Sequence, residues 1–155
     1  MKNKLIGLCL VIVIVIVIVW IYSGLQAPSK PKSVGEVIIN GLVLKVEIAS
    51  TSQQQTLGLG KRESLAGDSG MLFTYPDYGT RRFWMKDMKF PIDILWIKDN
   101  TIIGIDANVP APLEGQQSLP VYTSPQEVNY VLEVNAGWAE ENKVQIGDKV
   151  TLKLE

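Results

Sequence analysis

The distribution of apolar residues divides the chain into two parts. From Leu5 to Tyr22 the sequence LIGLCLVIVIVIVIVWIY contains no charged residue. After residue 33 the apolar residues occur in short groups, which often alternate with polar residues and are separated by Gly, Pro, Asn and Asp. A long unbroken apolar run is typical of a membrane helix, whereas short alternating groups are typical of strands in a water-soluble domain.

The apolar run has the length of a membrane-spanning helix. At roughly 1.5 Å per residue, residues 5–22 would extend about 27 Å as a helix, close to the ~30 Å hydrocarbon thickness of a bilayer. Lys2 and Lys4 precede the run, so the positive-inside rule predicts a cytoplasmic N-terminus at residues 1–4 and an extracytoplasmic domain. We predict a single transmembrane helix or signal anchor in the cell membrane. The alternative is a signal peptide whose cleavage releases a secreted domain.

The alternation after residue 33 predicts a mostly β domain over residues 34–155, joined to the helix by a Pro- and Ser-rich linker at 23–33. Asn40-Gly41 between two β-prone groups predicts a tight hairpin. Short helices are expected after the Ser50-Thr51-Ser52 capping sequence, ending at Gly58, and at 136–142. Strands are expected at residues 37–39, 42–48, 71–73, 82–86, 92–97, 101–107, 130–134 and 149–154, with a turn at 75–80 and a long loop at 108–125. This order predicts a small β-sandwich or a jelly-roll-like barrel with one or two short helices.

Composition narrows the chemistry available to the domain. The 15 basic and 16 acidic residues nearly balance and are dispersed, which gives no field that would attract nucleic acid. The chain has no histidine, and its one cysteine, Cys9, lies in the apolar run. Histidine-based catalysis, thiol catalysis and an intramolecular disulfide are therefore excluded for the domain. We expect no metal site and no cofactor, because the carboxylates also lack calcium-loop spacing.

Four sequence blocks resemble a known family. They are EIASTSQQQTLGLGKRESL near the start of the domain, GMLF at 70–73, FWMKDMKFPIDILWI at 83–97 and YVLEVNAGWAEENKVQIGD at 130–148. Over about residues 43–150 the chain resembles the bacterial and archaeal "domain of unknown function 192" family. That resemblance implies a compact, jelly-roll-like β fold that often follows a signal or anchor segment, and it supplies no reaction. Members often carry a cysteine in the loop before the 130–134 strand, where this chain has Val121-Tyr122-Thr123.

Trp84 is the first candidate binding residue. Strand alternation places Arg82, Trp84 and Lys86 on one face, with Phe83 and Met85 on the other. An exposed tryptophan between two cations would form a platform for a sugar ring or an acidic ligand. The alternative, which we favour from the sequence, is that Trp84 belongs to the core and that both cations extend past it to solvent.

Two carboxylates are predicted to face the interior. Asp93 shares a strand face with Leu95 and Ile97, and Glu133 and Asn135 share one with Val131. Arg62 and Lys86 are candidate partners, because an unpaired buried charge costs several kcal/mol. The favoured interpretation is structural: Asp93 would cap the turn at 88–90, and Glu133 with Asn135 would hold the following helical turn. The alternative is a carboxylate pair for acid–base catalysis in a cleft.

These observations favour an extracytoplasmic accessory domain that binds a ligand or partner over an enzyme. Envelope polysaccharide, a small ligand and another membrane protein are the candidate partners, besides the membrane itself. The alternatives are a hydrolase or lyase that uses Asp93 and Glu133, and an assembly protein that associates through an exposed edge strand or through the N-terminal helix.

Overall fold

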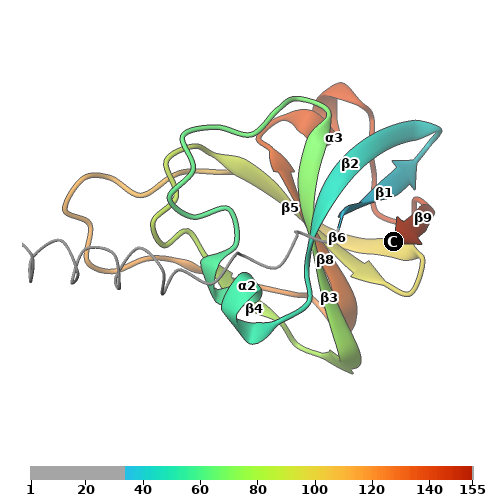
Figure 1. Cartoon of the computed structure of the whole chain (residues 1–155), viewed down its shortest axis with the longest axis horizontal. Helices are drawn as coiled ribbons and strands as arrows, with labels where there is room; N and C mark the ends of the chain where they lie inside the picture. The colour runs from blue at the N-terminus through green and yellow to red at the C-terminus, as the bar shows by residue number, and fades with distance from the viewer. Residues whose placement is uncertain (1–33, 155) are drawn as a thin grey trace, which may run out of the picture. The chain divides into compact units, whose positions relative to one another are not determined.

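Nine strands and two short helices make up residues 34–154, the part of the chain that the computed structural model describes (Figure 1). In chain order they are β1 (Val34–Ile39), β2 (Leu42–Ala49), α2 (Ser52–Leu57), β3 (Ser69–Gly79), β4 (Arg82–Trp84), β5 (Ile92–Lys98), β6 (Thr101–Val109), β7 (Val121–Thr123), β8 (Val128–Asn135), α3 (Trp138–Glu141) and β9 (Val150–Leu154). The mostly β class expected from the sequence is confirmed.

Seven of these strands form one sheet in the order β6-β5-β8-β3-β2-β1-β9. β2 and β3 are parallel, which requires a crossover, and the chain makes it through α2 and the loop at 58–68. The other neighbouring pairs are antiparallel. β4 and β7 form a separate two-stranded ribbon. The fold is therefore one curled sheet with a small ribbon, in place of the two facing sheets of a sandwich.

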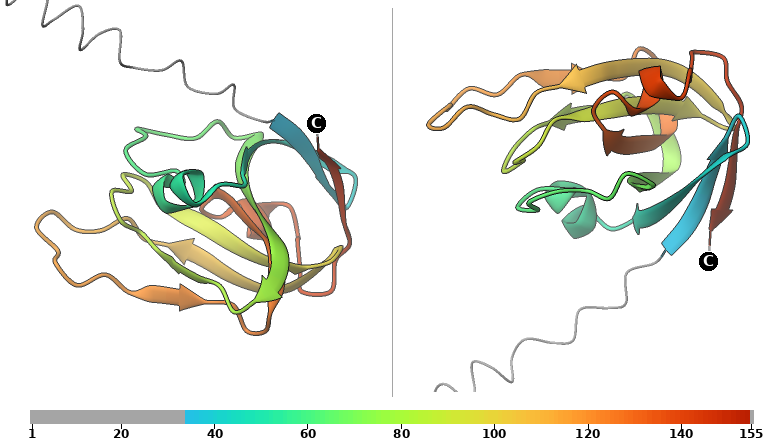
Figure 2. Two further views of the ribbon diagram at one scale, coloured as in Figure 1. Left: turned by 60° about the horizontal axis from the view of Figure 1, so that its bottom comes forward. Right: turned by 90° about the horizontal axis from the view of Figure 1, so that it is seen from above.

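The sheet curls around one hydrophobic core and almost closes on itself. Ile102 of the edge strand β6 and Val150 of the opposite edge strand β9 belong to the same buried cluster. The two edges of the sheet therefore lie close together. The backbone N–H of Ile102 donates to the carbonyl of Asp148 (3.0 Å), and that of Val150 donates to the carbonyl of Asn100 (2.9 Å). The resulting half-barrel is visible in both views of Figure 2.

A second buried cluster lies on the other face of the central strands. Met71 and Phe73 of β3, Ile94 and Trp96 of β5 and Val131 of β8 belong to it. The β4–β7 ribbon covers this face through partly buried aromatic residues. The same strands thus contribute alternate residues to two cores, which is why β5 is buried along almost its whole length.

Several local predictions are confirmed. Asn40 and Gly41 both have positive φ (52° and 83°), as the tight hairpin requires. Thr51 and Gln54 form a reciprocal capping box at the start of α2. The hairpin at 98–100 and the final strand are also present.

Two local predictions were wrong. β3 does not stop at Phe73 but continues to Gly79, and its pairing with β8 is interrupted between Thr74 and Gly79. Pro76 lies in that interruption, where its missing N–H removes no ladder hydrogen bond. β7 lies inside the segment that we expected to be a loop. The sequence pattern did not reveal this strand, because its stability depends on pairing with the distant β4.

The predicted anchor at 5–22 and the linker at 23–33 lie outside the described residues. Within residues 34–154 no helix has the length and apolar character needed to cross a membrane. Residues 33–155 form a compact unit of their own.

Candidate functional site

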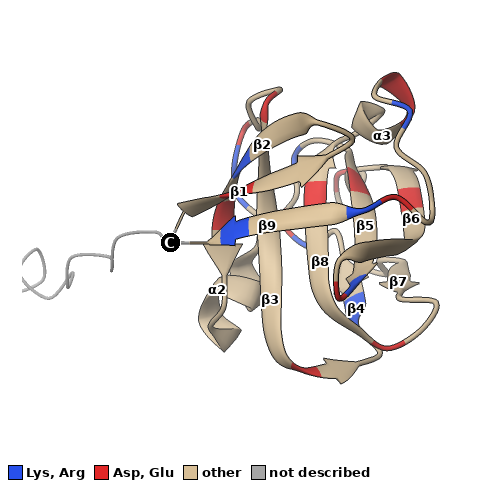
Figure 3. Cartoon of the chain, turned by 90° about the vertical axis from the view of Figure 1, so that its right-hand side faces the viewer, with Lys and Arg blue, Asp and Glu red and all other residues tan. Residues whose placement is uncertain are grey.

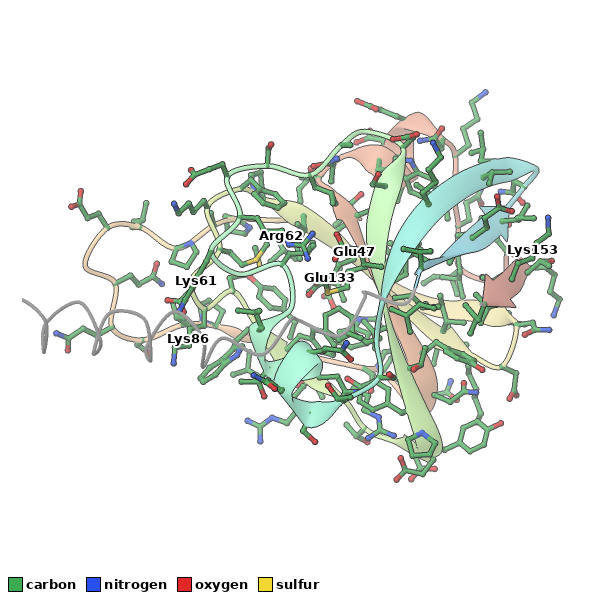
Figure 4. The ribbon with its side chains drawn as sticks, in the orientation of Figure 1. Glu47, Lys61, Arg62, Lys86, Glu133 and Lys153 are labelled. Carbon is green, nitrogen blue, oxygen red and sulfur yellow. The ribbon has the colours of Figure 1, made fainter. Side chains whose placement is uncertain are left out.

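The sheet register brings Glu133 beside residues that are far apart in sequence. Glu133 of β8 pairs with Met71 of β3, and Met71 pairs in turn with Glu47 of β2. Because paired residues project from the same face, the side chains of Glu47, Met71 and Glu133 form one row across the sheet. Figure 4 shows Glu47, Arg62 and Glu133 gathered at the centre of the domain.

Glu133 is buried and incompletely hydrogen-bonded. Its residue is 6% exposed, and its Oε2 atom has no hydrogen-bond partner within residues 34–154. Burial raises the pKa of the Glu133 carboxyl to about 8, although the nearby Arg62 guanidinium acts in the opposite direction. The carboxyl is therefore mainly protonated at neutral pH, and it offers a donor as well as an acceptor.

Arg62 is held by Glu47. Its Nη1 and Nη2 atoms donate to the two Glu47 carboxylate oxygens at 2.6 and 2.7 Å, the bidentate geometry that arginine forms with carboxylates. This bond, together with the negative charge of Glu47, raises the pKa of Arg62. Of the two predicted partners for the inward carboxylates, Arg62 therefore lies near Glu133 but binds another residue.

The β4–β7 ribbon presents Trp84 to solvent. Phe83 faces inward and packs edge-to-face on Phe73 and Trp96, with ring centroids 4.8 and 5.6 Å apart. The alternation along β4 then directs Trp84 outward, where it is 53% exposed. The Lys86 Nζ atom lies 5.5 Å from the centroid of the Trp84 ring. The prediction that Trp84 belongs to the core was wrong, whereas the predicted pattern of faces is confirmed.

A hollow of about 370 Å³ joins these elements. Glu133 and Phe73 contribute from the sheet, Trp84 and Lys86 from the ribbon side, and Tyr75 from the far end of β3. α2 and the residues after it supply the remaining wall, with polar groups from Ser52, Gln55 and Thr56. The volume suits a small polar ligand or one sugar unit, and the lining combines aromatic rings with a few polar groups, as in typical ligand sites.

Gly58 ends α2 directly beside the carboxyl. Its φ of 51° and ψ of −136° are accessible to glycine and strained for other residues. A Cβ atom added at this position would lie 3.4 Å from the Phe73 ring and 3.9 Å from Glu133 Oε2. The glycine therefore lets the chain turn away from the helix while staying close to the wall of the hollow.

Asp93 does not belong to this site. Ile94, its neighbour in β5, pairs with Glu133, so Asp93 projects from the opposite face of the sheet. Figure 3 shows the acidic positions of β5 and β8 close together along the sheet, but strand alternation separates their side chains. Asp93 is fully buried and accepts hydrogen bonds from the backbone N–H groups of Asn108, Gly137 and Ala139. The predicted carboxylate pair is thus excluded, and so is a mechanism that uses it.

The structural role expected for Asp93 is confirmed, but its location differs from the prediction. Asp93 holds the start of α3 instead of the turn at 88–90. Asn135 also holds another segment than expected, since its side-chain amide donates to the carbonyls of Leu65 and Ala66 at 3.1 Å. Both differences arise from tertiary pairing that local sequence does not specify. Lys86, the other proposed partner of these carboxylates, lies over Trp84 instead.

Sequence reasoning missed the wall formed by α2, together with Tyr75 and Lys61. Capping residues identified the helix, but its position over the sheet follows from the parallel β2–β3 crossover. Burial raises the pKa of Tyr75 to about 12, and Arg81 lies 3.9 Å from the centroid of its ring. Lys61 is positioned by a backbone bond from its N–H to the carbonyl of Asp87 (2.8 Å). No local motif signals either contact.

Comparison with known proteins places the chain in a family. Residues 36–152 match DUF192, described as an uncharacterised ACR. The chain belongs to the DUF192 family. The match extends beyond the 43–150 segment on which the resemblance was first based, and it runs from within β1 to within β9. Among curated proteins, no relative matches this DUF192 chain.

Two solved structures share the fold. A Sinorhizobium meliloti 1021 protein, provisionally described as a transcription regulator, is 32% identical with a TM-score of 0.70, over 82% of this chain and 98% of that one. A protein of unknown function from Novosphingobium aromaticivorans DSM 12444 is 28% identical with a TM-score of 0.72, over 81% of this chain and 89% of that one. The similarity therefore covers nearly the whole of both neighbours, and neither description names a ligand.

Proposed function

We propose that this DUF192 protein is an extracytoplasmic binding module that holds one unit of a carbohydrate in the hollow between Trp84 and Glu133. The observation that carries the proposal is the unpartnered Oε2 atom of Glu133, buried at a hollow whose rim presents an exposed tryptophan. A buried polar atom without a hydrogen bond costs about 1–3 kcal/mol, and a ligand hydroxyl would remove that cost.

The composition of the hollow favours a sugar over a wholly apolar ligand. A pyranose offers C–H groups for an aromatic face and hydroxyl groups for polar side chains. Here Trp84 supplies the aromatic surface, and the polar residues Gln55 and Thr56 line the hollow together with Glu133. The protonated carboxyl accepts from one hydroxyl and donates to another without placing a net charge in the site.

The proposed location outside the cytoplasm depends on the sequence of the N-terminal segment. The apolar run at 5–22 and the two lysines before it support a membrane anchor with an extracytoplasmic C-terminal domain. A module held in this way would meet envelope polysaccharide, which is one of the partners expected from the sequence.

The proposal is tested by calorimetric titration of the full chain with maltotetraose, cellotetraose and chitotetraose. The detergent must be zwitterionic, because detergents with sugar headgroups would compete for the site. We expect one of these probes to bind and Trp84→Ala to weaken its affinity at least about tenfold, or ~1.4 kcal/mol.

Tyr78→Ala is the matched control. Tyr78 is 50% exposed, much like Trp84, but does not line the hollow. Its removal should leave the affinity unchanged. Absence of binding by these three tetrasaccharides and by acidic oligosaccharides, or equal affinity of the wild-type and Trp84→Ala proteins for a bound oligosaccharide, would refute the proposed function.

A further inference from the structure

Three hollows meet at Lys86. The hollow over Glu133 has two neighbours, of about 730 and 500 Å³. The larger lies between Trp84 and the loop at 112–119, and the smaller lies between α2 and Lys61. Lys86 lines all three. Figure 2 shows α2, the segment after β4 and the loop after β6 projecting from the same end of the domain.

The charged groups around these hollows are mainly cationic. Within the described part of the chain, the three hollows are lined by three cations, Lys61, Arg82 and Lys86. The one exposed carboxylate among the described residues that lines them belongs to Asp87. None of the three cations forms a salt bridge with another residue in the 34–154 range. Elsewhere in residues 34–154 five cations have a carboxylate partner, namely Lys45, Arg62, Arg81, Lys89 and Lys153. The remaining three in this range, which do not line the hollows, have none: Lys98, Lys143 and Lys149.

Glu133, at the bottom of the hollow, does not cancel the positive charge of these three cations. Among residues 34–154, Glu133 is the only carboxyl besides Asp87 that lines the hollows, and its burial keeps it mainly protonated at neutral pH. In Figure 4 Lys61 and Lys86 lie together, away from the Glu47–Arg62 pair. A ligand that spans the hollows therefore meets a positive rim around a nearly neutral floor, which favours anions.

We propose that the natural ligand is an acidic oligosaccharide, a chain of carboxylate-bearing sugar units that crosses Lys86 and extends into the neighbouring hollows. This inference rests on the proposed function and names its ligand class. A sugar carboxylate that binds the Lys86 ammonium would lie beside the Trp84 ring, since the two groups are 5.5 Å apart. The adjoining units of the chain would reach Lys61 on one side and the 112–119 loop on the other.

The test compares tetragalacturonate with maltotetraose, a neutral chain of the same length. We expect tetragalacturonate to bind at least about tenfold more tightly than maltotetraose at low salt. This difference in affinity should decrease as added salt screens the exposed charges. Digalacturonate should bind more weakly than tetragalacturonate. Lys86→Gln should reduce the affinity for tetragalacturonate about tenfold, and it should reduce the preference of the protein for the acidic chain over the neutral chain.

Lys143→Gln is the charge-matched control, because Lys143 is exposed and lines none of the three hollows. Equal affinities for the acidic and neutral chains would overturn this inference and leave the proposed function standing. An unaltered affinity of Lys86→Gln for tetragalacturonate would also overturn it. Failure of every oligosaccharide to bind would instead overturn both.

Discussion

Glu133 is the residue at which stability and the proposed binding conflict. Its side chain lies among apolar residues of the second core, with one oxygen unpartnered. A buried methionine or leucine at this position would avoid that cost. Asp93, in contrast, accepts three backbone hydrogen bonds on the opposite face. Of these two inward carboxyl groups, Asp93 therefore serves the fold, and Glu133 is the one that we propose binds a ligand.

The raised pKa of Glu133 predicts a pH-dependent stability. The folded protein keeps the proton up to about pH 8, whereas the unfolded chain loses it near 4.5. This contribution is fully present below pH 4.5 and is lost as the pH rises to about 8. We expect the free energy of unfolding to fall across this window by on the order of a few kcal/mol relative to Glu133→Gln. Urea unfolding of both proteins from pH 4 to pH 9 measures the difference.

Glu127→Gln serves as the control, since Glu127 is exposed. Its unfolding curve should follow that of the wild-type protein at each pH. If Glu133→Gln and the wild-type protein show the same pH dependence, Glu133 is not a neutral buried acid, and its proposed role as a donor fails.

At the scale of elements, the hollow depends on α2 and the β4–β7 ribbon. Both lie over a sheet face that the second core makes apolar, and the ribbon is held there by Phe83. Ser124 links the ends of the ribbon, because its hydroxyl accepts from the Arg81 N–H and its own N–H donates to the Arg81 carbonyl, both at 2.9 Å. The two elements are short, so their positions depend on these few contacts.

Loss of the α2 capping box should affect both stability and binding. Thr51→Ala removes the side-chain oxygen that accepts from the Gln54 N–H, which costs about 1 kcal/mol. Because α2 forms one wall of the hollow, we also expect weaker binding of tetragalacturonate. Urea unfolding and calorimetry measure the two effects. Ser64→Ala, at an exposed loop position, is the control, and an unchanged affinity in Thr51→Ala would show that the wall is held by other contacts.

At the scale of the whole molecule, the domain holds itself together without disulfides, because residues 33–155 contain no cysteine. Both hydrophobic cores consist of residues from 37–150, and the curled sheet connects its two edges through the segment before β9. Residues 33–155 accordingly form a compact unit by themselves. An N-terminal anchor would determine where this compact unit is located in the cell.

The membrane prediction belongs to this scale. We expect the full chain to stay in the membrane pellet after alkaline carbonate extraction and a 33–155 fragment to be soluble, since residues 5–22 supply the apolar length. A C-terminal alkaline phosphatase fusion should be active in a bacterial host, and the corresponding fluorescent-protein fusion should be dark. Release of the chain into the soluble fraction with residues 5–22 still attached, or an inactive phosphatase fusion, would contradict the proposed topology.

Patterns within a few residues were enough to predict much of the local structure. The Asn40-Gly41 turn, the Thr51 cap and the alternation around Trp84 are determined by φ preferences, side-chain hydrogen bonds and strand geometry, which act over short distances. The absence of histidine from the whole chain likewise excludes several classes of catalytic chemistry through composition alone. Family membership also followed from the sequence blocks.

The tertiary structure decided which residues meet. Which strand pairs with β5, and in which register, determines that Asp93 and Glu133 face opposite sides. The β2–β3 crossover determines that α2 forms a wall beside Glu133, and pairing with β4 determines that β7 exists. These outcomes depend on contacts between residues tens of positions apart, whose energies are set by the packing of the complete sheet. Local sequence thus determined the kinds of side chain on each strand, and long-range pairing assembled the site from them.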